Sequence, residues 1–581
     1  MFNIVQYKKS NHASLFEKLS SMYDMSQLQN YIPIYNSIFL LNENNFNKIT
    51  LNTNETLLTL SSSADFNRED IYIKFAPIMD PFRFIMGKYS QYTDEIFCLP
   101  TFIKQNDNKE ISHPFYKINN PINSAYVDGF FYYLSTKLTE MYNFLNGVKS
   151  YGNFIGIKNN FKFKINDDLE YLITNNYFLK NSNKIFQVDD YSSIFSDEDD
   201  NCSKKHTNKK NRVNISTHSL TDETFGDILD IVEYENHFIP HEEIFCEQII
   251  SDENVLEFTE NIHDVIDMNE DDEDSNQNTS SDEDSVSESD DDDVKNEIED
   301  KDEEDEWITD SESESDSESE VQCEDEGEED IYVTLDKFPV NLIAMEKCSD
   351  TLDNLIEHDY FDTDEMWFAM LLQIIMTLLV YQKAFTFTHN DLHTNNVMYV
   401  ETEAEYIEYI YNKIKYRVPT FGKIYKIIDF GRSIYKVNDV LLCSDSYDVK
   451  GDANSQYNFE PFFNSKNKKV IPNPSFDLCR LATSMLDFLI ENPEKNPDVV
   501  RLIEEWCQDD KGKNVLYKKN GDERYPEFKL YKMIARSVNK HTPENQLTRN
   551  CFMSFISSSK ENTKYTIDID RIPPFFTRSI V

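Results

Sequence analysis

The chain has 581 residues, and its 107 acidic residues against 56 lysines and arginines give a formal net charge of −51. This length allows a two-part domain with insertions, because single domains hold about 100 to 200 residues. Nine cysteines without a Cys-x-x-Cys pair and 11 histidines without metal-like spacing disfavour a zinc site and a disulfide framework, and they fit a reducing compartment. There is no charged leader before an apolar stretch and no basic patch with interleaved aromatic residues, so neither secretion nor a nucleic-acid partner is expected.

The N-terminal part contains a predicted strand and a predicted helix that carry charged residues. The β-rich run Ile71–Phe75 includes Lys74, although a lysine in such a run is more often a solvated charge on a sheet edge. A helix is predicted over residues 123–146, and it offers Asp128 and Glu140. The lysine gains significance only from its order relative to motifs further along the chain.

A long acidic tract occupies residues 265–330. It contains 34 acidic residues against two lysines, so it supplies −32 of the total charge and has almost no apolar side chains to bury. This composition predicts disorder. The tract could bind a basic protein partner, or it could confer solubility alone. The basic run Lys204–Arg212 fits either a nuclear-import patch or an intramolecular partner of the tract.

Two apolar segments follow the acidic tract. Val340–Cys348 predicts a buried strand before a helix that begins near Thr351, and an ordinary edge strand would give the same pattern. Met366–Val380 is apolar almost all round, which predicts a buried core helix, with Asp362 and Glu365 as a capping-box pair at its start. At fifteen residues this run is short for a membrane span, which needs about 20, so no membrane partner is expected.

The most informative segment is the loop that begins at Thr388, together with a later Asp-Phe-Gly. Asp391 and Asn396 are five residues apart, a separation that lets a carboxylate orient an attacking hydroxyl while an amide reaches a magnesium ion. Asp429 follows a predicted strand and supplies a second carboxylate for the metal that bridges the phosphates. Gly431 then permits a sharp backbone turn. The loop with Asp391 and Asn396, followed later in the chain by Asp-Phe-Gly, indicates a phosphoryl-transfer site and an ATP-dependent kinase.

Two further segments accompany this motif. Residues 401–420 separate the predicted strand Asn396–Val400 from the strand before Asp429, and they could form a hairpin or a short helix. Pro474–Ala482 predicts the start of a long buried helix. Asp477 lies at its N-terminal end, where the helix dipole favours an acidic residue.

With these motifs the chain resembles eukaryotic-type protein kinases, and most closely the divergent serine/threonine kinases of large DNA viruses such as mimivirus. The resemblance implies an α+β, two-lobed kinase-like fold with a β-rich N-lobe, a mostly helical C-lobe and a long disordered acidic insertion. The implied parts are an N-lobe over residues 1–180, an insertion over 181–335 that is acidic from about 265, a last N-lobe strand and hinge over 336–349, and a C-lobe over 350–581.

The resemblance also implies catalytic and metal-binding roles in the loop and after it. Asp391 would be the catalytic base, and His389 would brace the loop. Asn396 and Asp429 would be the magnesium ligands. His393 takes the place of the lysine that would steady the γ-phosphate.

The implied nucleotide-binding roles belong to the N-lobe and the hinge. Lys74 would grip the α- and β-phosphates of ATP, with Asp128 slightly favoured over Glu140 as its acidic partner. Met345 would contact adenine through its side chain as the gatekeeper. Glu346 and Cys348 would contact adenine through their backbone. Gly431 would support the site, and Asp477 would support it by holding the backbone of the loop.

Several departures from the family pattern narrow this interpretation. No glycine occurs before Gly87, so a glycine-rich phosphate loop is missing. Asn390 replaces the arginine before the catalytic aspartate, which removes the cation that would pair with a phosphorylated activation loop. We therefore predict activity independent of such phosphorylation. Residues 459–461, Phe-Glu-Pro, are a poor substitute for Ala-Pro-Glu, so docking of a protein substrate has the least support.

Three functional hypotheses follow. The first is a serine/threonine protein kinase that uses ATP and Mg²⁺ and acts in the host cytoplasm or the virion. The second is a pseudokinase scaffold that binds partners through the acidic insertion. The third is an atypical kinase that phosphorylates a small molecule, since Asp-Leu-His also occurs in the loop of such enzymes.

Overall fold

The computed structural model describes residues 4–9, 12–60, 70–92, 94–102, 112–190, 330–462, 470–526, 528–559 and 561–576. The predicted disorder of the acidic tract lies outside these residues. Within them the protein is mixed α/β, with several sheets and helices. We call the described residues up to 190, together with 330–349, the sheet region, and those from 350 onward the helical region.

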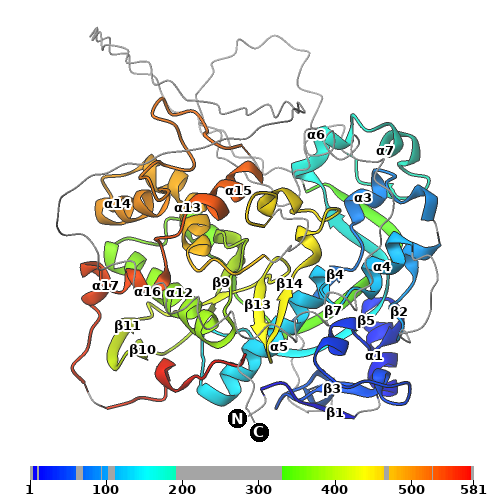
Figure 1. The fold of residues 1–581 in the computed structure, drawn as a ribbon, viewed down its shortest axis with the longest axis horizontal. Helices are drawn as coiled ribbons and strands as arrows, with labels where there is room; N and C mark the ends of the chain where they lie inside the picture. The colour runs from blue at the N-terminus through cyan, green and yellow to red at the C-terminus, as the bar shows by residue number, and fades with distance from the viewer. Residues whose placement is uncertain are drawn as a thin grey trace, which may run out of the picture. The chain divides into compact units, whose positions relative to one another are not determined.

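A five-stranded sheet forms the centre of the sheet region (Figure 1). Its strands run in the order β2-β5-β7-β4, and β6 also pairs with β7. The strands are β2 Met25–Gln29, β5 Ser150–Lys164, β7 Tyr332–Glu346, β4 Ile71–Pro77 and β6 Gln187–Val188. The strand predicted over 71–75 is therefore confirmed, and so is that predicted over 340–348, although β7 begins earlier and ends at Glu346. Among the described residues, the second edge of β4 has no partner strand.

Four smaller sheets complete the β structure. The pair β9 Val397–Glu401 and β12 Lys423–Ile427 is antiparallel, with Tyr399 opposite Tyr425, which confirms two predicted strands. Residues 401–420 contain a hairpin, so of the two alternatives for this segment the hairpin is correct. The remaining strands are β1 Tyr7–Lys9, β3 Ile49–Leu51, β8 Asp350–Thr351, β10 Tyr406–Tyr411, β11 Ile414–Pro419, β13 Ile434–Val437, β14 Val440–Cys443 and β15 Thr566–Asp568.

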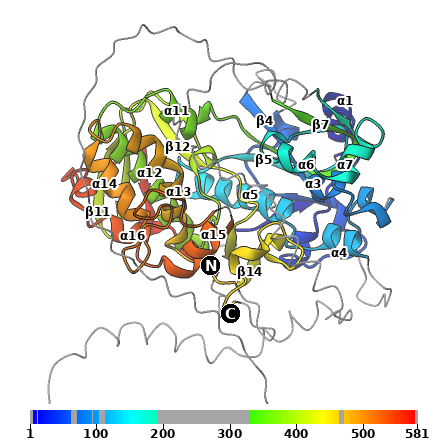
Figure 2. The ribbon, with the colours of Figure 1, turned by 90° about the horizontal axis from the view of Figure 1, so that it is seen from above.

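Helix α5 Ser124–Tyr142 lies between the sheet and the helices of the helical region (Figure 2). It confirms the helix predicted over 123–146, and the side chain of Asn123 caps it by accepting from the Ala125 amide at 3.0 Å. Toward the sheet, Asn341 Nδ2 donates to the Ala125 carbonyl at 2.7 Å. Toward the helical region, Ser135 and Tyr381 share a hydrogen bond of 2.9 Å. Helix α5 is therefore bonded to a strand of the sheet on one side and to a helix of the helical region on the other.

Helix α12 Asp364–Phe385 is the central helix of the helical region and matches the predicted core helix. The predicted capping residue Asp362 was wrong. The N-cap is Thr363, whose hydroxyl accepts from the Met366 amide at 3.3 Å. Among the described helices, α12 alone is long and apolar enough by composition to cross a membrane, but 89% of its apolar window is buried inside the protein, as in a core helix.

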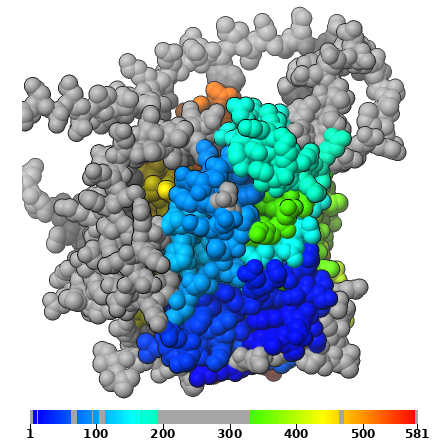
Figure 3. Space-filling model, turned by 90° about the vertical axis from the view of Figure 1, so that its right-hand side faces the viewer, coloured from blue at the N-terminus to red at the C-terminus, as the bar shows by residue number. Residues whose placement is uncertain are grey.

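Other helices cover these elements. The long buried helix expected from Pro474 onward is α13 Phe476–Glu491, and α15 Phe528–Ser537 lies further along the chain. The segments before residue 190 form most of the coloured surface in Figure 3, with part of β7 visible in green between them. The remaining α-helices are α1 Ala13–Tyr23, α2 Leu57–Leu60, α3 Pro81–Ile85, α4 His113–Asn119, α6 Leu169–Leu172, α7 Asn176–Asn181, α11 Leu352–Glu357, α14 Pro497–Trp506, α16 Pro543–Gln546 and α17 Asn550–Met553.

Candidate functional site

Three charged residues from distant parts of the sequence meet at the inner side of the sheet. Lys74 Nζ on β4 lies 2.8 Å from Asp128 Oδ2 on α5 and 2.9 Å from Asp429 Oδ1, just after β12. We call these three residues the lysine–carboxylate cluster. Of the two acidic residues considered as partners of Lys74, Glu140 pairs with Lys137 on its own helix. The lysine is therefore not a solvated edge charge.

The electrostatics of the lysine–carboxylate cluster favour the charged forms of Lys74 and Asp429, whereas burial raises the pKa of Asp128 to about 6. Burial acts to lower the pKa of Lys74, but Asp128 and Asp429 outweigh it and hold this pKa well above the ordinary lysine value. Burial also acts to raise the pKa of Asp429, and Lys74 reverses that effect, so the Asp429 pKa lies below its ordinary range. The side chain of Asp429 is 48% exposed and that of Asp128 only 2%. Asp429 is thus a charged carboxylate that an incoming ligand can reach.

The backbone at Asp429 is held by α5. Its amide donates to the Tyr132 hydroxyl at 2.9 Å, and the Phe430 amide donates to Asp128 Oδ1 at 2.7 Å. Asp429 itself adopts a left-handed conformation with φ 61°, whereas Gly431 has no positive φ. The prediction that Gly431 supplies the unusual backbone conformation of this turn was therefore wrong. The turn uses Asp429, since aspartate tolerates this region better than most residues.

The loop around Asp391 is fastened by a buried carboxylate. Asp477, at the start of α13, accepts from the amides of His389 at 2.9 Å and Asn390 at 3.0 Å. Burial raises the pKa of Asp477 to about 7, and the two hydrogen bonds oppose this rise. His389 Nε2 lies 2.8 Å from the Ile428 carbonyl and ties the loop to the strand that precedes Asp429. Asp477 and His389 thus have the positions that the sequence predicted for loop supports.

Asn396 is bonded through its backbone to the residue that precedes Asp429. Its carbonyl accepts from the Ile428 amide at 3.0 Å. Its Nδ2 donates to the Asp391 carbonyl at 2.9 Å and lies 3.1 Å from His393 Nε2. Because the amide nitrogen is used in this way, the side-chain oxygen is left for a metal.

An amide oxygen and a carboxylate are the hard oxygen donors that Mg²⁺ prefers. The described residues contain no cluster of three or more histidine, cysteine, aspartate or glutamate side chains suited to a metal. A metal at Asn396 and Asp429 would therefore need further oxygen ligands from its substrate or from water. This is how Mg²⁺ usually binds with phosphates.

Asp391 is covered by two side chains that sequence reasoning missed. Its Oδ1 accepts from the Tyr531 hydroxyl of α15 at 2.7 Å, and its Oδ2 lies 3.3 Å from Arg432 Nη1. Arg480 stacks over the Tyr531 ring with its guanidinium carbon 4.9 Å from the ring centroid. We call Asp391, Arg432, Tyr531 and Arg480 the Asp391 cluster.

The charge of Asp391 survives its burial. Burial acts to raise its pKa, but Arg432, with smaller contributions from His393 and Arg480, lowers it below the ordinary aspartate value. Burial lowers the pKa of His393 to about 4, so this side chain is neutral near pH 7. Arg432 directly follows Asp-Phe-Gly, and this position was the one signal in the sequence that could have indicated a contact with Asp391. Tyr531 carries no motif that could have indicated it.

The segment that follows Gly431 is fastened to its surroundings by hydrogen bonds and ion pairs. Asn390 is buried, and its Nδ2 donates to the Arg432 carbonyl at 3.2 Å. Arg432 Nη2 forms an ion pair with Asp452 at 2.9 Å. Asp445 accepts from the Ser124 amide, at the start of α5, at 3.0 Å and pairs with Lys117 at 2.8 Å. The carboxylates of Asp452 and Asp445 thus fasten the segment after Gly431 to the surrounding protein.

The predicted hinge residues lie at the end of β7. Met345 is buried and faces Tyr72 across the β4–β7 pair. The Glu346 carboxylate accepts from Lys426 Nζ at 2.6 Å and from the Lys149 amide at 2.8 Å. Cys348 is also buried, and burial raises the pKa of its thiol to about 11, as expected for an inert cysteine.

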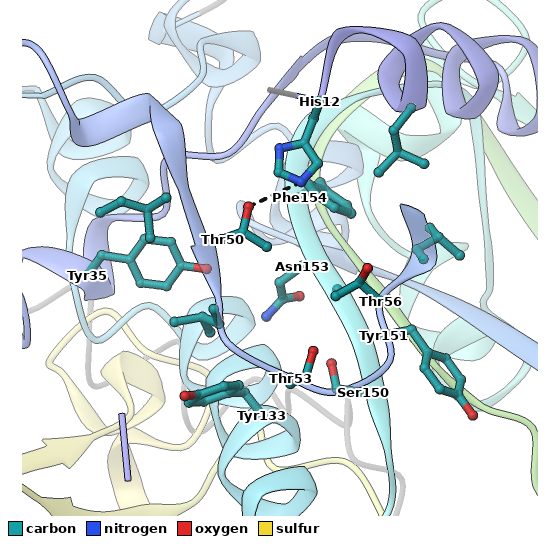
Figure 4. A pocket seen from close by; sticks show the side chains of 15 residues that line it. His12, Tyr35, Thr50, Thr53, Thr56, Tyr133, Ser150, Tyr151, Asn153 and Phe154 are labelled. Atoms are coloured by element: carbon teal, nitrogen blue, oxygen red, sulfur yellow. Dashed lines mark hydrogen bonds between the residues drawn. The ribbon is translucent and has the colours of Figure 1, made fainter. Parts of the chain in front are cut away.

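A small polar cavity lies elsewhere in the sheet region (Figure 4). His12 and Thr50, which share a hydrogen bond of 3.1 Å, line it together with Asn153 and Tyr133. His12 Nδ1 and Asn153 Oδ1 have no hydrogen-bond partner among the described residues. Its volume of about 30 Å³ suits water, which needs roughly 10–15 Å³, and is too small for a nucleotide.

Comparison with known proteins gives one short similarity. No family model matches the chain. A segment of 95 residues is 35% identical to "Uncharacterized protein 098R" of Invertebrate iridescent virus 6. This segment covers 15% of the chain and only 16% of the length of that viral protein. The similarity supports a viral origin for the chain.

Proposed function

We propose that the chain is an ATP- and Mg²⁺-dependent serine/threonine protein kinase with a two-lobed kinase-like fold. The sheet region would be its N-lobe and the helical region its C-lobe. One observation carries the proposal: Lys74 contacts both Asp128 and Asp429 while the loop that bears Asp391 and Asn396 is bonded to the strand before Asp429. On this proposal, four chain segments would supply the separate parts of a phosphoryl-transfer site at one place.

On the nucleotide side, Lys74 would bind the α- and β-phosphates and would be held in place by Asp128. Asn396 and Asp429 would hold Mg²⁺, which when bound neutralises charge on the phosphate oxygens. The 48% exposure of the Asp429 side chain supports this role, because a ligand can reach the carboxylate. Adenine would lie against Met345, with the Glu346 and Cys348 backbones at its edge.

On the acceptor side, Asp391 would orient the hydroxyl of a serine or threonine and accept its proton. The hydroxyl oxygen forms the new bond to the γ-phosphorus, the bond from that phosphorus to the β–γ bridging oxygen breaks, and ADP leaves. The lowered pKa of Asp391 supports its role as a charged acceptor. Catalysis would consist mainly of positioning and electrostatic stabilisation.

The fixed contacts of Asp445 and Arg432 support activity without activation-loop phosphorylation. The Asp445 carboxylate joins the segment after Gly431 to the N-terminus of α5, the helix that carries Asp128. A phosphate group would serve the same purpose in a regulated kinase. With a viral origin, we propose the host cytoplasm or the virion as its place of action.

The test is transfer of the γ-phosphate from Mg-ATP to a broad protein mixture by wild type, Asp391→Asn and Asp429→Asn. We expect labelled serine and threonine with the wild type alone. Equal labelling by all three proteins would refute the site. Asp359→Asn, at an exposed ion pair with Lys495, is the matched control and should label like the wild type.

A further inference from the structure

Both carboxylate oxygens of Asp391 are already bound by side chains of the same chain. Oδ1 accepts from the Tyr531 hydroxyl at 2.7 Å and Oδ2 contacts Arg432 Nη1 at 3.3 Å. Tyr531 is 140 residues away in sequence and belongs to α15. The bond is therefore a tertiary contact between the loop and a separate helix.

The contact closes access to Asp391. Asp391 is 7% exposed, and Tyr531, which covers it, is 1% exposed. An acceptor hydroxyl must come within about 2.6–3.2 Å of a carboxylate oxygen to lose its proton to it. The Tyr531 hydroxyl occupies such a position at Oδ1. An external hydroxyl has to displace it.

The Tyr531 hydroxyl matches an acceptor hydroxyl chemically. It is a neutral O–H group that donates to a carboxylate, as a serine or threonine hydroxyl would. Burial raises the pKa of Tyr531, so the phenol keeps its proton and remains a donor. The contact therefore imitates the acceptor without the backbone that a peptide would bring.

Helix α15 is a short helix that is held by its contacts with the rest of the protein. It has ten residues, and isolated helices shorter than about 12–15 residues are marginal in water, so its order depends on its contacts. Five of its ten side chains are buried, and two aromatic–guanidinium contacts, Phe528 with Arg432 and Tyr531 with Arg480, add to this packing. In this state Arg480 Nε is buried with no hydrogen-bond partner among the described residues. An unpaired buried donor destabilises the closed arrangement.

We propose that Tyr531 is an autoinhibitory group that occupies the acceptor position at Asp391, and that α15 must move outward before a substrate hydroxyl can bind. This inference rests on the proposed kinase function. The nucleotide side is not covered in the same way, because the side chains of Lys74 and Asp429 are 25% and 48% exposed. Mg-ATP therefore binds to the closed state, and acceptor binding requires the open state.

The test compares the full-length wild type with Tyr531→Phe, which keeps the ring and removes the hydroxyl. Loss of a hydrogen bond to a charged group, typically worth tenfold or more, should raise kcat/KM for dephosphorylated casein by about tenfold. The effect should appear mainly as a lower KM for casein, with the Kd for Mg-ATP unchanged. Hydrogen exchange of the α15 amides should become faster.

Tyr517→Phe is the matched control, because Tyr517 also donates its hydroxyl to an aspartate, Asp487, away from Asp391. It should leave casein kinetics unchanged. A lower kcat in Tyr531→Phe at unchanged KM would show that Tyr531 positions the base, and the blocking role would be rejected. Unchanged kinetics and unchanged exchange would reject it as well. Failure of the wild type to bind Mg-ATP at all would instead reject the kinase function itself.

Discussion

The lysine–carboxylate cluster and the Asp391 cluster are neighbouring charged sites with opposite access. In the first, Asp429 has a side chain that is 48% exposed, and its partner Lys74 is held from two sides. In the second, the Asp391 side chain is 9% exposed, and both its oxygens have partners within the chain. On the proposed function, the residues assigned to the nucleotide would be assembled and open, while the residue assigned to the acceptor would be assembled and covered. Control of turnover would then lie with acceptor access.

Replacing Lys74 by Met should damage the open cluster most. It removes the cation that would bind the phosphates and leaves Asp128 and Asp429 close together without compensation. Loss of one preorganised electrostatic partner typically costs about 10²–10³ in rate, so we expect a fall of that size in kcat/KM for ATP. Steady-state kinetics with varied Mg-ATP would measure it.

The Lys74→Met variant should leave the Asp391 cluster intact, with unchanged hydrogen exchange in α15. Lys137→Met, which breaks the Lys137–Glu140 pair on α5, is its control and should retain activity. A Lys74→Met enzyme as active as the wild type would contradict the role of the open cluster.

Replacing Asp445 by Asn tests how the N-terminus of α5 is anchored. The change removes the charge that pairs with Lys117 and weakens the bond to the Ser124 amide at the start of α5. A hydrogen bond to a charged group contributes about 1.5–3 kcal/mol, so the free energy of unfolding should fall by about 2 kcal/mol. Denaturant unfolding would measure this, with Asp439→Asn at a longer ion pair as control. A loss equal to that of the control would show that Asp445 does not anchor α5.

The smallest expected effect concerns pH and His393. Burial lowers the pKa of His393 to about 4 from its ordinary value near 6.5, so the fold favours the neutral ring. The resulting stabilisation is fully present above pH 6.5 and is lost as the pH falls through 4. Because one pKa unit corresponds to about 1.4 kcal/mol, we expect His393→Gln to reduce the loss of stability between pH 6.5 and 5 by about 1.5 kcal/mol. An equal effect from His358→Gln, at an exposed position, would contradict this assignment.

Local motifs predicted one cluster better than the other. Asp391, Asn396 and Asp429 were found because their spacing reflects a local chemical requirement, and α12 was found because its apolar pattern is continuous. The bond between Tyr531 and Asp391 spans 140 residues, and that between Asp445 and Ser124 spans 321. Such contacts depend on the tertiary fold and leave no spacing or periodicity in the sequence.

Smaller errors came from residues with similar preferences. Asp362 and Thr363 are both good helix caps, and the structure uses Thr363. At the Asp-Phe-Gly turn, glycine was expected to supply the unusual backbone, but Asp429 has the positive φ. In both cases the predicted feature, a helix cap or a turn, is present, but a residue one or two positions away forms it.

The most direct test of the two-cluster account separates nucleotide binding from transfer. Binding of ATP should be measured with and without Mg²⁺ for the wild type, Asp429→Asn and Asp391→Asn, alongside phosphorylation of casein. The account predicts that Asp429→Asn loses the Mg²⁺-dependent part of binding, while Asp391→Asn binds Mg-ATP like the wild type and transfers no phosphate. Mg²⁺-dependent binding that survives in Asp429→Asn, or transfer that survives in Asp391→Asn, would contradict it.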